Sequence, residues 1–464
     1  MRELIMDFFE CDRGKQHKCS EVPVVNLDAL NMVKVIGLMS IITGHVMLAI
    51  GNFSANMIGQ AAAYKRDHFL STLFSITFVV DSIFVISGLL FSYVALKRFK
   101  GEIKSSRTFS QISRIAGKLL FGRYLRLVPL YFVYFWFKKS VYMYLGHGPL
   151  WNHGFNQYDS YGACKQQSWL TPFTHLSAYM PLGQQCVFPA WTVASEIFFI
   201  LITTPALIVL TKKPRLSIYL LATIGFASFF FMPCEAFYRI DPIDLRSLNS
   251  FGNNLLHLVV VKYSNIYTNP NYRLPSVLSG LVSGYFLHRY ETGSRRWPSW
   301  FTNYATKTAI ASFGILILSH FMIPSFVESD LKDKLVATNI FIHTEVTFRL
   351  AWALASCILF LRLVTDCQGA PVVRLFRGRF GRAMCKLNLA AVLIHADVIF
   401  IKYVAVRDLT AGYSFFKWMD TSLIVYCYTI ILSALVHVFV ENPINKLIQS
   451  LLYDHDHGEL KKKQ

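Results

Sequence analysis

The chain has 464 residues, of which 54% are hydrophobic and 16% are charged, and it carries a formal net charge of +19. This composition is too apolar for a soluble globular protein of this length, so it predicts an integral membrane protein. Basic residues of multi-span proteins gather in cytoplasmic loops, so the positive charge reflects orientation in the membrane and does not indicate nucleic-acid binding.

About ten apolar runs are long enough to cross a bilayer. A helix needs ~20 mostly apolar residues to cross the hydrocarbon core, where unpaired backbone groups exclude open sheets. The expected fold is therefore all-α, a polytopic bundle of about ten transmembrane helices. In chain order the expected spans are 28–50, 73–96, 121–145, 189–210, 216–233, 273–290, 305–323, 346–364, 384–403 and 419–440.

The basic residues indicate on which side of the membrane each connection lies. Lysine and arginine are frequent in 97–126, whereas the long connection 146–188 contains only Lys165. The first segment is therefore expected in the cytosol and the second on the other side, and an even number of spans places both termini in the cytosol. The expected domains are a cytosolic tail over 1–26, one transmembrane domain over 27–447 and a cytosolic tail over 448–464.

Cysteine and lysine positions add two expectations. Cys164 and Cys186 share the connection assigned to the non-cytoplasmic side, where disulfides persist, so they are expected to pair. The nine cysteines fit no zinc spacing, and no metal site is expected. Near the C-terminus, Lys461 and Lys462 resemble a dilysine retrieval signal, with an ordinary solvated basic tail as the equal alternative. The expected location is the endoplasmic reticulum rather than the plasma membrane.

Ionisable side chains at membrane depth are costly and mark candidate functional positions. Lys34 and His45 are eleven residues apart in the first span, about three helical turns, which places them on one helical face. Arg123 and Arg126 form an i,i+3 pair whose guanidinium groups can converge on a phosphate, although membrane anchoring is the alternative. The other candidates are Asp81, Glu196, His395, Asp397, His437 and Glu441.

The histidine in the first span has two interpretations of equal weight. A neutral imidazole, with an ordinary pKa of ~6.5, can take a proton from a hydroxyl, as general-base acyl transfer requires. An imidazole can also be buried only to make a hydrogen bond between two helices. The chemistry of His45 alone does not separate these interpretations.

Seven short motifs occur in the order found in a known family. The first is LNMVKVIGLMSIITGH, which ends at His45, and the others are VDSIFVISGLL, GRYLRLVPLY, PAWTVASEIFF, YRLPSVLSGLVSGY, LNLAAVLIH and FVENP. With these motifs the chain resembles the acyltransferase-3 family of multi-span O-acyltransferases, and in particular its nose-resistant-to-fluoxetine-like branch. The resemblance covers nearly the whole chain.

The resemblance implies transfer of an acyl group from cytosolic acyl-CoA to an acceptor hydroxyl at or across the membrane. His45 would be the general base that removes the acceptor's proton. A carboxylate would orient this imidazole, and the candidates are Asp81 and Glu196. His395 is a second candidate imidazole, with a structural role as its alternative, and His437 is expected to be structural.

The resemblance also implies the donor and partners. The phosphates of acyl-CoA would be bound by Lys34, Arg123 and Arg126 at the cytoplasmic mouth of the bundle. No cofactor is expected to be bound permanently, since acyl-CoA is a substrate. The expected partners are membrane lipid, acyl-CoA and a hydroxyl-bearing acceptor, either a lipid, a sterol, a sugar or a small molecule, and no nucleic acid.

Two other functions remain open on the sequence. A transporter or a lipid- or xenobiotic-handling protein would also have many spans with buried charges, although no inverted repeat is detectable. A catalytically silent scaffold is the third interpretation. It rests on two departures from the family pattern: Lys34 stands where arginine is usual, and Phe198 stands where the animal branch commonly has glutamine.

Overall fold

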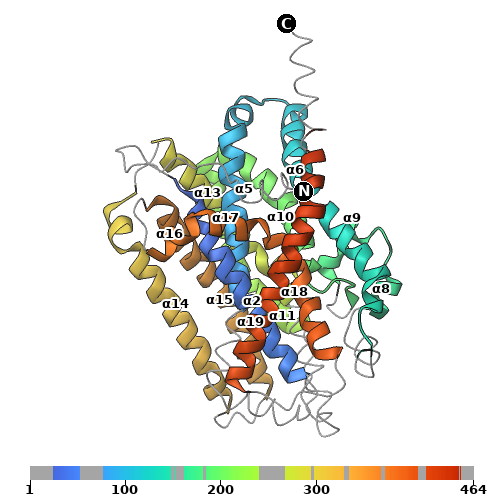
Figure 1. Ribbon diagram of the computed structural model, residues 1–464. Coiled ribbons are helices and arrows are strands. Elements are labelled where there is room, and N and C mark those ends of the chain that lie inside the picture. The colour runs from blue at the N-terminus through green and yellow to red at the C-terminus, as the bar shows by residue number, and fades with distance from the viewer. Residues whose placement is uncertain are drawn as a thin grey trace.

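All regular elements of the residues that the structure describes are helices, as the sequence predicts. The structure is a computed structural model (Figure 1), and the dilysine pair Lys461 and Lys462 lies outside its described residues. The described residues are 25–52, 77–147, 151, 161–180, 184–239, 267–293, 297–328, 334–366, 371–405, 414–448 and 450.

The helices fall into a long and a short set. The long helices are α2 (Leu30–Asn52), α5 (Thr77–Ser105), α6 (Phe109–Ser140), α10 (Ala190–Lys212), α11 (Pro214–Arg239), α13 (Leu274–Glu291), α14 (Ser299–Glu328), α15 (Lys334–Thr365), α18 (Asn388–Val404) and α19 (Phe415–Val436). The short helices are η1 (Leu27–Ala29), η3 (Tyr142–Tyr144), α8 (Tyr161–Gln166), α9 (Thr171–Thr174), η4 (Leu176–Tyr179), η7 (Pro270–Arg273), α16 (Pro371–Arg377), α17 (Arg379–Lys386) and η8 (His437–Glu441).

Five helices in the described residues are long and apolar enough to cross a membrane, so the expected count of about ten is not confirmed. A sixth is added if α17 and α18, which meet at a bend of 62°, form one broken span. The expected ninth span, 384–403, crosses this bend. The five helical segments are Leu27–Ile50, Phe78–Ser105, Ala190–Lys212, Thr347–Thr365 and Phe415–Ile448.

The helix α6 shows why length alone does not make a span. It begins twelve residues before the expected span 121–145, where the Thr108 side chain and Gln111 form a capping box. Two arginines lie near its middle and two lysines, Lys138 and Lys139, lie in its last turn. These four cations interrupt the apolar surface, so α6 does not pass as a span on apolarity, although it is helical over most of the expected range.

The helices α5 and α13 pack unusually closely because glycines line their contact. A Cβ atom added at Gly88 would lie 2.2 Å from the Val277 carbonyl oxygen, and one at Gly280 would lie 2.1 Å from the Val85 carbonyl oxygen. Small residues allow helix backbones to approach in this way inside membranes. The two backbones are therefore in direct contact and form a rigid pair.

Two ion pairs also lie at the ends of this contact, one between α5 and η7, which leads directly into α13, and one between α5 and α13. Near the start of α5, Asp81 is paired with Arg273, both side chains are 0% exposed, and Ser276 donates a 2.8 Å hydrogen bond to the same carboxylate. Near the other end, Lys97 and Glu291 form a 2.9 Å pair whose side chains are 58% and 26% exposed. The two pairs therefore differ mainly in their exposure to solvent.

The helix α2 lies among α5, α18 and α19 (Figure 1), and its second half is packed into an apolar cluster. Ile42 and Val46 of α2 contact Ala391 of α18 and Val425 of α19, all nearly inaccessible. In addition, the Trp418 indole donates a 2.9 Å hydrogen bond to the carbonyl oxygen of Thr43. This packing fixes the rotation of α2 around the position of His45.

Candidate active site

The histidine of the first span is hydrogen bonded to a second histidine. The Nδ1 atom of His45 lies 2.8 Å from the Nε2 atom of His395, and the two rings are nearly parallel, with an interplanar angle of 10°. His395 is 1% exposed, whereas His45 is only partly buried. In the described residues the Nε2 atom of His45 has no hydrogen-bond partner. The structure thus brings together the two imidazoles that the sequence nominated separately.

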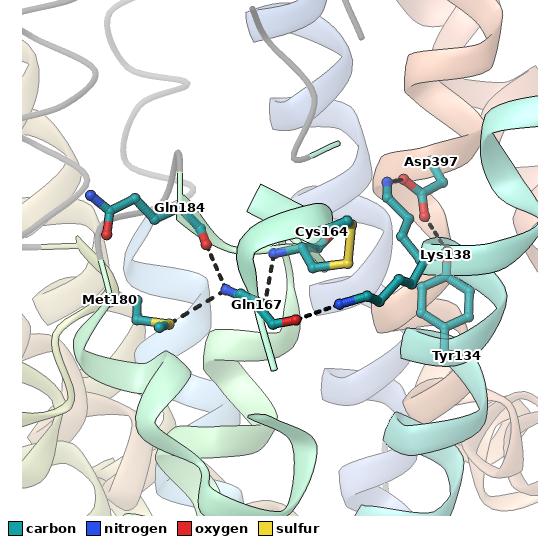
Figure 2. Close-up of a disulfide and its surroundings, with 9 residues drawn as sticks. Tyr134, Lys138, Cys164, Gln167, Met180, Gln184 and Asp397 are labelled. Carbon is teal, nitrogen blue, oxygen red and sulfur yellow. Dashed lines mark hydrogen bonds and ion pairs between the residues drawn. A yellow bond between two sulfur atoms is a disulfide. The ribbon is translucent and has the colours of Figure 1, made fainter. Parts of the chain in front are cut away.

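The segment closed by the disulfide reaches this pair of histidines. Cys164 and Cys186 are joined by a disulfide, as their shared connection suggested. Two residues later, the ring of Phe188 stands edge-on to His45, with 5.7 Å between the ring centroids. Gln167 holds the segment together, since its side-chain amide donates to the Gln184 carbonyl oxygen at 2.5 Å (Figure 2). The disulfide therefore supports the chain that places Phe188 against the imidazole.

The three cations expected at the donor site lie near one another. Lys34 of α2 is close enough to Arg123 and Arg126 of α6 for the charges to interact. Arg126 is exposed and Lys34 is partly buried. Neither Lys34 nor Arg126 makes a hydrogen bond or an ion pair with the described residues, although Glu441 and Glu196 lie within electrostatic range of Arg126. These two cations are therefore free to bind an anion.

Arg123 differs from the other two cations because it already has partners. Its Nη2 atom donates to Glu196 at 2.7 Å and to the Ser87 hydroxyl at 2.6 Å. The Ser87 hydroxyl in turn donates to Glu196 at 2.6 Å. This small network connects α5, α6 and α10. It holds the guanidinium of Arg123 in place and occupies its Nη2 atom, whereas Arg126 makes no such bond with the described residues.

Neither carboxylate expected to orient His45 is hydrogen bonded to it in the described residues. Asp81 is paired with Arg273, and Glu196 is paired with Arg123. The physical reason is that each carboxylate is buried or half-buried beside an arginine, and a charge-assisted hydrogen bond to that arginine is stronger than one to a neutral imidazole. The role as the partner of His45 is taken by His395.

Two further polar clusters lie on α18 and after α19. Asp397, two residues beyond His395, is bonded to Lys138 and to the Tyr134 hydroxyl of α6, and these residues are shown in Figure 2. His437 and Glu441 are bonded at 2.8 Å within the π-helix η8. The first cluster links α18 to α6, whereas the second is an i,i+4 contact within η8 that gives the buried Glu441 a partner. His437 is consistent with its expected structural role.

Sequence reasoning missed the partners of several buried charges. Arg273, Lys138 and Tyr134 were not nominated, although each neutralises or satisfies a carboxylate that was. One signal in the sequence could have found them, because a carboxylate at membrane depth is costly and usually pairs with another side chain.

Phe198, one of the two departures from the family pattern, packs edge-on against Tyr179, with 5.6 Å between the ring centroids.

Fold and site together define a helical membrane protein with a hydrogen-bonded pair of histidines and a group of cations farther along the same first helix and on α6. The chain is similar to nose resistant to fluoxetine protein 6 of Caenorhabditis elegans, with 20% identity over 384 residues. The match covers 80% of this chain but only 44% of the relative's length, and it supports a nose-resistant-to-fluoxetine-like relationship. No family model matches the chain. No solved structure matches it either.

The disulfide gives a test of membrane orientation. Because disulfides persist on the non-cytosolic side, a non-reduced digest of the protein from native membranes should yield the cross-linked Cys164–Cys186 peptide by mass spectrometry. Free thiols at both positions before reduction would contradict the pairing and the orientation of 146–188.

Proposed function

We propose that this protein is an integral membrane acyltransferase that moves an acyl group from cytosolic acyl-CoA to an acceptor hydroxyl at or across the membrane. One observation carries the proposal: α2 presents Lys34, with Arg126 nearby, and also His45 about 16 Å farther along the helix. Acyl-CoA has a matching arrangement, since its phosphates and its thioester lie at opposite ends of one elongated molecule.

The proposed reaction uses His45 as the general base. The Nε2 atom of His45 accepts the proton of the acceptor hydroxyl while the hydroxyl oxygen attacks the thioester carbonyl carbon. The carbon–sulfur bond then breaks, and the departing CoA thiolate takes the proton back from the imidazolium. The products are the ester of the acceptor and free CoA thiol. The partly exposed face of His45 beside Phe188 is where the two substrates would meet.

The proposed donor site uses the unpaired cations. Lys34 and Arg126 would bind the phosphates of acyl-CoA, and guanidinium groups suit phosphate oxygens because they donate two parallel hydrogen bonds. Arg123 is held by Glu196 and Ser87, so it would add positive charge near the phosphates without making the main contact with them. Membrane lipid and a hydroxyl-bearing acceptor complete the proposed set of partners, and location in the endoplasmic reticulum belongs to the same proposal.

A second candidate is a protein that handles lipids or xenobiotics without acyl transfer. The name of the C. elegans relative, which refers to resistance to fluoxetine, favours this candidate. The two candidates differ in one measurable property, because only the acyltransferase releases CoA thiol. Binding of small lipophilic molecules without thiol release would support the second candidate.

The deciding assay uses the purified full chain in lipid nanodiscs. Radiolabelled acetyl-CoA and palmitoyl-CoA are supplied separately, and CoA thiol release and label transfer to extracted lipid are measured. We expect thiol release from at least one donor. The absence of both thiol release and CoA binding for both donors would contradict the proposal.

Arg126→Ala tests the donor site within the same assay. Loss of a charge-assisted contact worth about 1.5–3 kcal/mol should raise the apparent KM for acyl-CoA by roughly 10- to 100-fold. Arg126→Lys, which keeps the charge but loses the two-point contact, should show a smaller increase.

The matched control for this substitution is Arg114→Ala, which removes the same charge from an exposed position three turns earlier on α6. This control should leave the KM for acyl-CoA unchanged. Equal CoA affinity in the wild type and in Arg126→Ala, measured by calorimetry, would show that Arg126 does not contact the donor.

A further inference from the structure

The hydrogen bonds around the two histidines determine where their protons lie. The Nδ1 atom of His395 is 2.8 Å from the Val392 carbonyl oxygen. A carbonyl oxygen only accepts, so this Nδ1 atom must carry the proton, and the Nε2 atom of a neutral His395 must then be an acceptor. The contact from the Nε2 atom of His395 to His45 therefore requires that the Nδ1 atom of His45 donates. In a neutral His45 the remaining nitrogen, Nε2, is then unprotonated.

We infer that His395 is a positioning residue that holds His45 in the tautomer with a proton on Nδ1 and a free lone pair on Nε2. The consequence of this inference for catalysis rests on the proposed function, since Nε2 of His45 is the atom that would take the proton from the hydroxyl of the acceptor substrate. Carboxylates commonly fix the tautomer of a catalytic histidine. Here a neutral imidazole, itself fixed by a backbone carbonyl, takes that role.

A neutral partner suits this position because it adds no buried charge to the resting protein. An unpaired carboxylate beside His45 would carry a large desolvation cost at membrane depth. When His45 becomes protonated during the reaction, its Nδ1–H still donates to His395, and the bond becomes charge-assisted. His395 can therefore stabilise the transient imidazolium without being charged itself.

The structure holds His395 rigidly enough for this role. Its ring is 1% exposed and lies parallel to that of His45, with 5.1 Å between the ring centroids. The helix α18 is fixed from another direction, because Asp397 is bonded to Lys138 and Tyr134 of α6. The apolar contacts of Ala391 with α2 fix the face that carries His395.

Two substitutions separate positioning from simple packing. His395→Leu removes the acceptor and fills the space with an apolar side chain, so it should lower kcat by at least about 10-fold, since part of the general-base effect is lost, with little change in the KM for acyl-CoA. His395→Gln offers an amide oxygen near the place of Nε2, so it should recover most of kcat. Equal losses in the two variants, or wild-type kcat in a folded His395→Leu protein, would overturn the inference.

Nuclear magnetic resonance of the wild-type protein gives a readout that does not need activity. In histidine-labelled protein in nanodiscs, the His45 signals are identified by their loss in His45→Ala. One-bond nitrogen–proton coupling should appear at Nδ1 and not at Nε2 in the neutral state. A proton found on Nε2 of His45 would overturn the inference even if the enzyme is active. A proton found on Nδ1 without any acyl transfer would support the tautomer and contradict the proposed function.

Discussion

Replacing His45 with alanine should lower turnover by at least ~100-fold, which is the lower end of the usual contribution of a general base. The reason is that the Nε2 atom of His45, which has no hydrogen-bond partner in the described residues, is the proposed acceptor of the proton beside Phe188. The measurement is CoA thiol release by the purified variant at saturating acyl-CoA, so that donor binding does not limit the rate.

The alanine variant also leaves the Nε2 atom of His395 without its partner, so its thermal stability must be measured. His45→Asn is the better-matched variant, because its amide group lies near the place of Nδ1 and can still donate to His395. It cannot act as a base, so it should lose as much turnover as the alanine variant. A folded His45→Asn protein with near wild-type turnover would remove His45 from the mechanism.

Replacing Arg273 with alanine should lower the free energy of unfolding by about 3–5 kcal/mol, because it leaves the carboxylate of Asp81 buried without its main partner. The effect is measured by denaturant titration of the protein in detergent micelles. Acyl-CoA binding should change only as far as the folded fraction changes, since this pair joins α5 to η7 and includes none of the proposed donor-site cations.

The chain provides its own control for this loss. Lys97→Ala breaks the exposed ion pair between α5 and α13 and should cost at most ~1 kcal/mol. The double variant Asp81→Leu with Arg273→Leu removes both buried charges and should be more stable than Arg273→Ala. Equal destabilisation by Arg273→Ala and Lys97→Ala would show that burial does not determine the strength of these pairs.

The sequence predicted which charges lie at membrane depth but not how they pair. Lys34, Arg123 and Arg126 come together as expected, because two of them share one helix and the third lies at the same end of the first span. The pairing of Asp81 with Arg273 and of Glu196 with Arg123 depends on the rotation of each helix about its axis. Hydropathy and residue spacing specify a helical face but not the neighbour that it contacts.

The number of spans was predicted less well than the helical class. The run 384–403 reads as one apolar segment, yet the structure bends by 62° between Lys386 and Asn388. No glycine or proline marks the bend, so the local signals of a break were absent. In contrast, the pairing of Cys164 with Cys186 needed only their shared connection and its side of the membrane.

The close pair formed by α5 and α13 has a consequence for biogenesis. Asp81 and Arg273 are 192 residues apart in the chain. At a synthesis rate of about 5–20 residues per second, the carboxylate emerges roughly 10–40 s before its arginine. During that interval Asp81 lacks its arginine, and an unpaired carboxylate is costly at membrane depth. The rigid centre of the molecule is therefore assembled late, after more than half of the chain has been made.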